Sequence, residues 1–352
     1  MQTIHVPVND AYDVLVERGI LQKSGEIIQK LVSAETCVII TDDNVDKFYS
    51  QTVEQSLRNS GFRTAKFVFP HGETSKNADT LLKIYTFLCQ HEITRSDCLI
   101  ALGGGVVGDI TGFAAATFLR GLPYIQIPTS LLAQVDSSVG GKTAIDLPEG
   151  KNLVGAFKQP AAVLCDPDTL KTLPEPFLID GMGEVIKYGM IADAELFQKL
   201  SSYDLHSVHE YFDEIIPACI AIKRDVVAED ELDTGLRMIL NFGHTLGHAI
   251  EAYYHYETYT HGCAVAAGMC LITKTLGNEK DYLKLKACAE RYHLPTNVPA
   301  PLPELAALCG NDKKRSGKKL RYIICDPIGT ADIRSESLSD FRNHFASPDL
   351  KG

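Results

Sequence analysis

The sequence predicts two domains: an α/β domain with a mainly parallel sheet at residues 1–175, followed by an all-α domain at residues 176–352. Up to about residue 175, short β-branched runs alternate with segments of helical spacing, which is typical of a parallel sheet covered by helices. After the proline-marked junction at residues 172–177 (TLPEPF), long helical segments follow, and no strand is indicated until residues 320–325 (LRYIIC). A chain of 352 residues is long enough for both domains.

The expected strands of the first domain are short apolar runs bounded by polar residues. They are residues 37–41 (CVIIT), 66–69 (KFVF), 98–102 (CLIAL), 124–127 (YIQI) and 162–165 (AVLC). Residues 77–90 carry helical spacing, and residues 109–119 are expected to form a helix with an apolar inner face. Two domains of this kind place the default site in a cleft between them.

Composition narrows the classes of protein to which the chain can belong. Its formal net charge of -11 argues against nucleic acid or an anionic membrane as the main partner, because both select basic surfaces. The first residues lack the basic and apolar regions of a signal peptide, and no apolar run approaches the ~20 residues that cross a bilayer. The 10 cysteines include no C-x-x-C pair, so reduced thiols are expected. We therefore expect a cytoplasmic protein.

A glycine-rich turn follows the third expected strand. Gly103, Gly105 and Gly108 have the G-x-G-x-x-G spacing of a dinucleotide-binding turn between a strand and a helix. The acid that should follow about 20 residues later, to hold a ribose, is missing, because Gln126 and Pro128 stand there. Glycine N–H groups at a helix start attract anions, but a tight turn also needs glycines for positive φ. The motif alone leaves both interpretations open.

The strongest local signal is NFGHTLGHAIE at residues 241–251. His244 and His248 are four residues apart and so lie on one face of a helix, and His261 follows 13 residues after the second of them. The glutamate of H-E-x-x-H is replaced by Thr245, which disfavours a metalloprotease. Histidines hydrogen-bonded within a helical core are the commoner explanation of such a pair, so a third ligand is needed to favour a metal.

Glu184 is the natural third ligand, because an unpaired carboxylate would be costly to bury on its apolar, glycine-flanked helix. One glutamate and two histidines with an open fourth position suit a catalytic divalent ion, above all Zn²⁺. The alternative for Glu184 is an i,i+3 surface pair with Lys187. Two further alternatives are His255 in place of His261 and a thiolate ligand from Cys263.

Basic and amide side chains are concentrated in both halves of this acidic chain. Residues 139–143 (VGGKT) look like the end of a P-loop, but Asp136 stands where its first glycine is required, which disfavours an ATPase. The donors suited to a phosphate are then Arg120, Lys142, Lys151 and Asn152 in the first half and Lys223, Arg237 and Asn241 in the second. Spacings of four, three and four would put four side chains on one helix face toward the same cleft: Arg237, Asn241, His244 and His248.

Six segments, taken together and in order, resemble the 3-dehydroquinate synthase family. They are GGGVVGDITGFAAATFLRG, IPTSLLAQVDSSVGGKTAID, KNLVGAF, GMGEVIKYGMI, NFGHTLGHAIE and HGCAVAAGM, and the resemblance runs from about Thr41 to the DKK at residues 312–314. The resemblance implies a homodimer that uses NAD and one divalent metal ion, zinc or cobalt. It also implies a nucleotide-binding α/β domain and a helical metal-binding domain, an architecture shared with glycerol dehydrogenases and iron-type alcohol dehydrogenases.

The implied reaction is a step of the shikimate pathway of aromatic amino acid biosynthesis. It converts the sugar phosphate 3-deoxy-D-arabino-heptulosonate 7-phosphate to 3-dehydroquinate and phosphate. The implied course is transient oxidation by NAD, β-elimination of phosphate, re-reduction, ring opening and aldol closure.

The resemblance also implies roles for individual residues. The metal ligands would be Glu184, His244 and His261, the last of which precedes a glycine as in the family. Contacts to NAD would come from Asp42, Asn44, Glu73, Lys76, Gly104, Gly105, Asp109, Thr129 and Ser130, together with Asp136, Lys142 and Lys151. The last three would also line the substrate pocket, with Asn152, Lys187, Lys223, Arg237, Asn241, His248 and Lys314 or its neighbour Lys313. Arg120 would reach the substrate phosphate of the neighbouring subunit, and Cys263 departs from the glutamate expected after the H-G pair.

Other functions share parts of this pattern. A glycerol-dehydrogenase-like oxidoreductase would have the same fold, metal and cofactor, but its small neutral substrate would not need so many basic donors. Another sugar-phosphate cyclase would share the mechanism, whereas Arg237, Asn241 and the DKK segment suit a substrate carboxylate and favour the dehydroquinate reaction. A catalytically inactive binding protein would require the loss of a site residue, and every expected one is present.

Overall fold

The computed structural model describes residues 1–309 and 319–346 and divides the chain into two units. Unit 1 comprises Met1–Pro174 and Lys223–Leu232, and unit 2 comprises Glu175–Ile222 and the chain from Asp233 onward. The last residues of helix α7 (Phe212–Glu229) thus belong to unit 1, although the helix begins in unit 2. No helix within the described ranges combines the length and apolar character needed to span a membrane.

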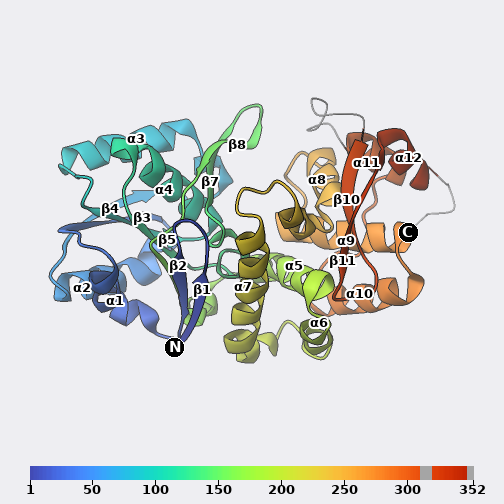
Figure 1. Ribbon diagram of the computed structural model, residues 1–352, viewed down its shortest axis with the longest axis horizontal. Coiled ribbons are helices and arrows are strands. Elements are labelled where there is room, and N and C mark those ends of the chain that lie inside the picture. The colour runs from blue at the N-terminus through green and yellow to red at the C-terminus, as the bar shows by residue number, and fades with distance from the viewer. Residues whose placement is uncertain (310–318, 347–352) are drawn as a thin grey trace. The chain divides into compact units, whose positions relative to one another are not determined.

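Unit 1 is built around a seven-stranded sheet of order β1-β2-β9-β6-β5-β3-β4 (Figure 1). Neighbouring strands pair in parallel except at one edge, where β1 and β2 are antiparallel. The mainly parallel sheet predicted from the sequence is therefore confirmed. In sheet order the strands are β1 (Gln2–Val6), β2 (Tyr12–Val16), β9 (Ala162–Cys165), β6 (Tyr124–Pro128), β5 (Cys98–Gly103), β3 (Thr36–Asp42) and β4 (Arg63–Phe69).

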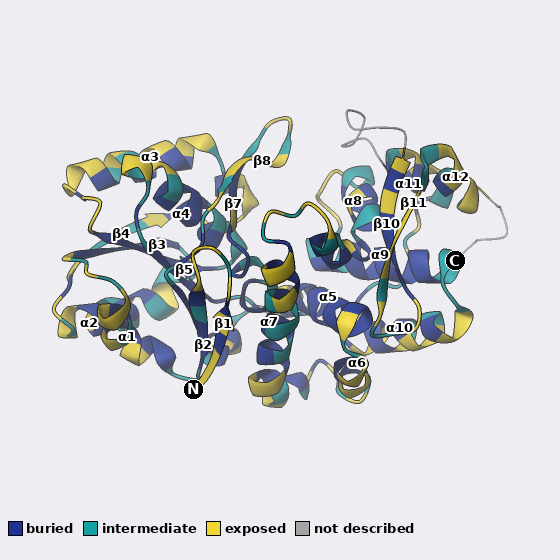
Figure 2. Ribbon diagram, in the orientation of Figure 1, coloured by how far each residue is buried: buried dark blue, intermediate teal, exposed yellow. Residues whose placement is uncertain are grey.

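Helices cover both faces of this sheet (Figure 1). One face packs against α1 (Ser24–Leu31), α2 (Gln51–Asn59) and the 3-10 helix η1 (Ile20–Lys23), and the other against α3 (Ala78–Gln90) and α4 (Gly105–Thr117). The central strands are buried on both sides, which explains why their sequences are continuous apolar runs rather than alternating ones. Figure 2 shows this buried interior in dark blue.

A second, two-stranded sheet in unit 1 was not predicted. Strands β7 (Lys142–Leu147) and β8 (Gly150–Phe157) form an antiparallel hairpin. A Cβ on Gly112 of α4 would lie 2.4 Å from Cγ2 of Thr143, so this glycine lets the hairpin approach the helix. The short helical turns of unit 1 are η2 (Asp46–Ser50), η3 (Glu73–Ser75), η4 (Phe118–Arg120), η5 (Ala133–Ser137) and η6 (Pro167–Thr172).

Unit 2 is mainly helical, as predicted, and carries in addition the antiparallel hairpin of β10 (Lys319–Cys325) and β11 (Ala331–Ser337). Two of its helices, α5 (Glu175–Ala192) and α9 (His261–Leu276), are buried along most of their length, which Figure 2 shows in dark blue. A helix that is apolar on all sides is typical of a domain centre. The surrounding elements are α6 (Ala194–Leu200), η7 (Val208–Tyr211), α7, η8 (Leu236–Asn241), α8 (His244–Tyr253), α10 (Glu279–Arg291), α11 (Leu302–Leu308) and α12 (Leu338–His344).

Candidate metal centre and cofactor site

Three helices of unit 2 approach one another closely at glycines. A Cβ on Gly183 of α5 would lie 2.3 Å from the carbonyl oxygen of Gly262 on α9. A Cβ on Gly268 of α9 would lie 2.2 Å from the carbonyl oxygen of Gly243, which precedes α8. No side chain fits at such distances, so only glycine permits this packing. The residue after Gly183 is thereby brought beside the residue before Gly262.

Those two residues, Glu184 and His261, form a cluster with His244, in which the potential ligand atoms all lie within 4.8 Å of one another. The Oε1 atom of Glu184 lies 3.5 Å from Nε2 of His244 and 3.6 Å from Nε2 of His261. This oxygen is buried and accepts no hydrogen bond from the residues that the structure describes. A buried carboxylate oxygen without a donor, placed between two imidazole nitrogens, fits a divalent cation with one oxygen and two nitrogen ligands.

The two imidazoles differ in their protonation. Burial, together with Lys187 and the two neighbouring histidines, lowers the pKa of His244 well below its usual value, so this ring is neutral. Its Nδ1 lies 3.1 Å from the carbonyl oxygen of Phe242, so this nitrogen carries the proton and donates it. The lone pair of the neutral ring is then on Nε2, the nitrogen that faces Glu184. Burial alone would lower the pKa of His261, but the nearby carboxylates, Glu251 first among them, raise that pKa to about 9. Without a metal, the protonated His261 supplies the positive charge of the cluster.

Lys187 forms an ion pair with the other carboxylate oxygen of Glu184. Its Nζ pairs with Oε2, and both side chains are fully buried, one helical turn apart on α5. The alternative of a surface pair is therefore wrong, because this pair lies inside the domain. The two oxygens of Glu184 thus face different groups, an ammonium at Oε2 and two imidazoles at Oε1.

His248 lies beside this cluster and is exposed. Its ring centroid is 5.5 Å from that of His244 and 6.1 Å from that of His261, as expected for residues on one face of α8 and on the adjoining α9. The groups of potential metal ligands within residues 1–309 and 319–346 include neither His255 nor Cys263.

Arg237 and Asn241 do not share a helix with the two histidines of α8. They lie on the 3-10 helix η8, which ends at Asn241, and α8 begins only at His244. Between them the backbone turns at Gly243 with φ +81°, a conformation that favours glycine. The prediction of one continuous helical face through all four residues is therefore wrong. Arg237 is buried and Asn241 is exposed.

The glycine-rich turn of unit 1 lies at the carboxyl end of β5. Helix α4 begins at Gly105, a turn earlier than expected, and its N-cap Gly104 offers no capping side chain. A Cβ on Gly103 would lie 2.4 Å from Cγ2 of Val107, so close packing also requires this glycine. A Cβ on Gly104 would lie 3.4 Å from Oγ of Ser130, which follows the neighbouring strand β6. The carboxyl ends of adjacent parallel strands, where α/β proteins bind nucleotides, thus bring Gly104, Gly105, Thr129 and Ser130 together.

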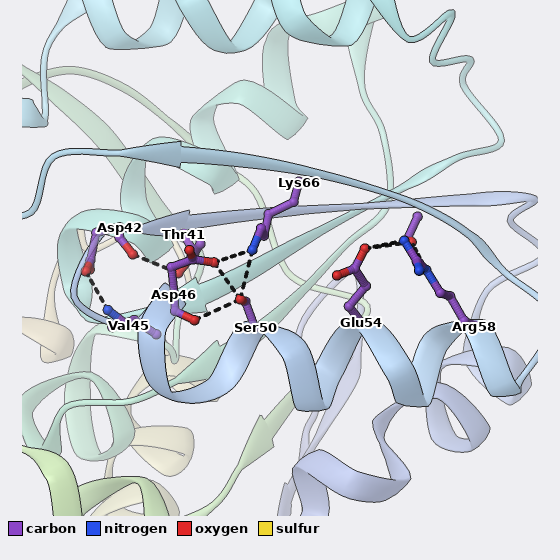
Figure 3. A network of polar contacts seen from close by, with 9 residues as sticks. Thr41, Asp42, Val45, Asp46, Ser50, Glu54, Arg58 and Lys66 are labelled. Carbon is purple, nitrogen blue, oxygen red and sulfur yellow. Dashed lines mark hydrogen bonds and ion pairs between the residues drawn. The ribbon is translucent and has the colours of Figure 1, made fainter.

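The loop after β3 is fixed by its own hydrogen bonds. Oδ1 of Asp42 accepts the backbone N–H groups of Asn44 and Val45, each at 2.9 Å. Figure 3 shows the bond from Val45. The next loop, after β4, is tied to it by Asp43, whose Oδ1 accepts the backbone N–H of His71 at 2.9 Å and lies 2.7 Å from Nδ1 of its ring. Sequence reasoning missed this link between two loops that carry expected NAD contacts.

The connection between β4 and α3 also carries Lys76, whose side chain is buried. Its Nζ lies 2.6 Å from Oδ2 of Asp109 and donates to Oδ1 of Asn152 at 2.5 Å, with Glu73 3.8 Å away. Asn152 has φ +57° and donates its N–H to Asp146 at 2.7 Å. The structure thus joins four residues that the sequence singled out, through one lysine.

Lys223 and Asp136 also pair within unit 1. The Nζ of Lys223 donates to Oδ1 of Asp136 at 2.9 Å and to its carbonyl oxygen at 2.6 Å. Lys142 opens β7, Lys151 lies on β8 and Arg120 ends η4, and all three are exposed. Lys313 and Lys314 lie outside the described residues.

Sequence reasoning also missed two buried carboxylates of unit 2, Asp180 and Glu251. Asp180 accepts the backbone N–H of Gly262 at 2.6 Å, and Glu251 faces His261. Each stands at helical spacing from a residue that was identified: Asp180 four before Glu184, and Glu251 three after His248. That spacing was the available signal.

The chain is similar to known proteins along nearly its whole length. Family models described as the N-terminal and C-terminal parts of 3-dehydroquinate synthase match residues 66–180 and 181–315. The 3-dehydroquinate synthase of Clostridium acetobutylicum is 51% identical over 95% of this chain and 96% of its own, and that of Streptococcus suis is 49% identical over 94% and 95%.

Among solved structures, ValA, a 2-epi-5-epi-valiolone synthase from Streptomyces hygroscopicus subsp. jinggangensis with NAD⁺ and Zn²⁺ bound, superposes with a TM-score of 0.84. It is 26% identical, and the match covers 95% of each chain. The two family models together match most of the chain, and the two relatives share about half of their residues with it over nearly its full length. The chain therefore belongs to the 3-dehydroquinate synthase family.

Proposed function

We propose that this chain converts 3-deoxy-D-arabino-heptulosonate 7-phosphate to 3-dehydroquinate and phosphate, with NAD and one divalent ion, Zn²⁺ or Co²⁺, as cofactors. The observation that carries the proposal is the unpartnered Oε1 of Glu184 between the Nε2 atoms of two histidines. Membership of the family and the NAD⁺ and Zn²⁺ bound to the related valiolone synthase support it.

The residues of unit 2 hold the metal and move protons. Glu184, His244 and His261 supply the ligands, and Lys187 neutralises the second oxygen of the carboxylate. When bound, the metal polarises a substrate hydroxyl, and NAD⁺ accepts a hydride that it later returns. His248, exposed beside the cluster, exchanges a proton with the substrate through its imidazole. Arg237 binds the substrate carboxylate, because a planar guanidinium matches a planar carboxylate.

The residues of unit 1 hold NAD and the phosphate. The start of α4 at Gly104 and Gly105 accepts the pyrophosphate, since N–H groups at a helix N-terminus favour anions. Further NAD contacts come from the end of β3 and the loops that follow β3, β4 and β6, through Asp42, Asn44, Glu73, Lys76, Thr129 and Ser130, and from Asp109 in the second turn of α4. Asp136, Lys142, Lys151, Asn152 and Lys223 of unit 1 contact the substrate, and the basic groups among them stabilise the negative charge on the departing phosphate. We assign a further substrate contact to Lys314, which follows much later in the chain.

The decisive experiment measures phosphate release from the heptulosonate phosphate, with and without a chelator, while NADH is followed in parallel. We expect one phosphate per turnover, no net accumulation of NADH, and loss of activity with the chelator that added Zn²⁺ or Co²⁺ restores. Steady accumulation of NADH from a polyol, without phosphate release, would instead indicate a glycerol-dehydrogenase-like oxidoreductase. Faster turnover of a ketose phosphate that lacks the carboxylate would indicate another cyclase.

We also propose that the protein is a cytoplasmic homodimer in which Arg120 serves the site of the partner subunit. Two variants that are inactive alone test this arrangement, Arg120→Ala and His244→Ala. In a randomly exchanged mixture, half of the dimers combine the two variants and each of these has one intact site, so about a quarter of wild-type activity should return. No return of activity, with mixed dimers shown by mass spectrometry, would place Arg120 in its own subunit's site.

A further inference from the structure

The ring of His261 lies between two carboxylates, one at each nitrogen. Its Nε2 is 3.6 Å from Oε1 of Glu184, and its Nδ1 is 3.6 Å from Oε1 of Glu251. Glu251 lies on α8, three residues after His248, and its side chain is only 6% exposed. A carboxylate is buried at such cost only when it is paired, and the imidazole faces it directly.

The two nitrogens of His261 have different surroundings. Nε2 shares the neighbourhood of Glu184 with Nε2 of His244, so it is the nitrogen that faces the proposed metal. A metal-bound imidazole normally donates its other N–H to a carboxylate or a carbonyl oxygen, which sets the tautomer and the plane of the ring. His244 has such a partner in the carbonyl oxygen of Phe242. For His261 the partner is the carboxylate of Glu251.

The backbone of His261 is held by a different group. Oδ1 of Asp180 accepts the N–H of Gly262 at 2.6 Å, in the first turn of α9, where the N-cap Thr260 makes no side-chain capping bond. Asp180 therefore determines where α9 begins, and Glu251 is left to determine how the imidazole is turned. The two carboxylates act on different degrees of freedom of the same residue.

We propose that Glu251 is a positioning residue: it accepts the Nδ1–H of His261, directs Nε2 toward the metal and increases the affinity for the ion. This inference rests on the proposed metal site, but it does not depend on which substrate is used. A charged acceptor such as Glu251 also makes His261 a stronger electron donor to the metal. The neutral carbonyl acceptor of His244 has a smaller effect on that ring.

The same atoms permit one rival arrangement, a second metal position formed by His248, Glu251 and His261, whose ligand atoms also lie within 4.8 Å of one another. If both positions were filled, His261 would have to bind metals through both nitrogens and lose both ring protons. In the simpler state, His261 binds one ion through Nε2 and donates the Nδ1–H to Glu251, so it keeps one ring proton. The stoichiometry of bound metal distinguishes the two arrangements.

The test measures Zn²⁺ binding by the dialysed full-length protein, with stoichiometry from elemental analysis and affinity from competition with a chromophoric chelator. Glu251→Ala should lower the affinity by about 10–100-fold, which is typical of the loss of such a partner. Glu251→Gln keeps an oxygen acceptor and should lower it less. With saturating Zn²⁺, kcat of both variants should lie within a few-fold of wild type. The matched control is Glu257→Gln, an exposed carboxylate on the connection that follows α8, and it should bind Zn²⁺ as wild type does.

Unchanged affinity in both Glu251 variants, with one Zn²⁺ per chain, would overturn the positioning role. Two Zn²⁺ per wild-type chain and one per Glu251→Gln chain would also overturn it, in favour of the second metal position. If the alanine variant does not fold by circular dichroism, the glutamine variant decides, because it keeps the size of the side chain. If the Zn²⁺ affinity depends on Glu251 as expected but the wild-type chain releases no phosphate, the proposed function is refuted and this inference stays intact.

Discussion

The charged clusters of the two units differ in how completely their own side chains neutralise them. In unit 2, Oε1 of Glu184 is buried without a donor from the described residues, between two imidazoles. In unit 1, Lys76 lies 2.6 Å from the carboxylate of Asp109, and Lys223 lies 2.9 Å from that of Asp136. The cluster of unit 2 thus keeps one carboxylate oxygen without a hydrogen-bond donor, although Lys187 pairs with the other oxygen, whereas both lysines of unit 1 are paired with carboxylates.

This difference predicts how each cluster responds to its ligand. A metal ion completes the cluster of unit 2 and replaces the proton that His261 carries without it. An anionic ligand in unit 1 must share lysines that already pair with carboxylates, Lys76 with Asp109 and Lys223 with Asp136. These ion pairs can persist when the ligand is bound. Substitution of a metal ligand in unit 2 should therefore abolish metal binding, whereas substitution of one paired lysine in unit 1 should weaken NAD binding by a smaller factor.

The largest effect is expected from His244→Ala in unit 2. Loss of one of two imidazole ligands should remove bound metal and lower kcat by more than about 1000-fold, because the metal supplies several kcal/mol of transition-state stabilisation. Elemental analysis and phosphate release measure the two effects. His255→Ala is the control, since this exposed histidine lies outside the potential ligand groups of the described chain. A stoichiometric ion retained by His244→Ala would refute its assignment as a ligand.

The second prediction concerns pH and the cluster of unit 2. The pKa of His261 is raised from 6.5 to about 9, and the metal binds its neutral form, so the apparent affinity should rise about tenfold per pH unit between pH 7 and 9 and then level off. For the metal-free protein the sign is opposite. The protonated ring contributes stability that is complete below about pH 6.5 and is lost as the pH rises through 9. Zn²⁺ titrations and thermal unfolding across this range measure both, and a flat affinity would contradict a protonated ring.

Much of the sheet in unit 1 and of the cluster in unit 2 could be predicted from the sequence, but from different signals. The central strands of unit 1 are buried on both faces, so their apolar runs were readable, as at Cys98–Gly103. The strand β8 (Gly150–Phe157) is exposed along almost its whole length and carries no alternation, so the β7–β8 hairpin was missed. The edge strand β1 (Gln2–Val6) is also half exposed and was missed as well.

In unit 2 the sequence indicated the cluster but not its full arrangement. Helical spacing placed His244 and His248 on one face of a helix, and the cost of burying Glu184 pointed to a third ligand. Spacing alone assumes a continuous helix, so it could not anticipate the turn at Gly243 that separates Arg237 from the histidines. Contacts between distant segments, such as that of Glu251 with His261, arise from glycine-mediated helix packing that one helical pattern does not encode.

The third prediction concerns Lys76 in unit 1. In Lys76→Met, the carboxylate of Asp109 loses its ion pair and Asn152 loses its donor, so NAD should bind about tenfold more weakly. Titration of the metal-loaded protein with NAD⁺ measures this change. The affinity for Zn²⁺ should stay unchanged, because Lys76 and the metal ligands belong to different units. The exposed Lys83→Met is the control, and equal NAD affinity in the two variants would remove Lys76 from the cofactor site.

The smallest effect is expected where unit 1 carries an ion pair away from both clusters. Asp46 pairs with Lys66 at 2.6 Å and accepts the hydroxyl of Ser50 at 2.5 Å (Figure 3). Burial opposes ionisation of Asp46, but hydrogen bonds from Lys66 and Ser50 outweigh it and lower its pKa below 3.8. A carboxyl whose pKa is lowered on folding stabilises the native state above pH 3.8, and this stability is lost as the pH falls through the lower, folded-state value.

Asp46→Asn should accordingly lower the free energy of unfolding by about 1 kcal/mol at pH 7, a value typical of one partly buried ion pair with its hydrogen bonds. The deficit should shrink as the pH falls below about 4, because the wild-type carboxyl then becomes neutral too. Urea unfolding, with hydrogen exchange in β3 and β4 to localise the loss, measures the change. Asp10→Asn, at an exposed position of the same unit, should show no such deficit. Altered Zn²⁺ affinity in Asp46→Asn would break the distinction between the units, because Asp46 belongs to unit 1 and the metal ligands belong to unit 2.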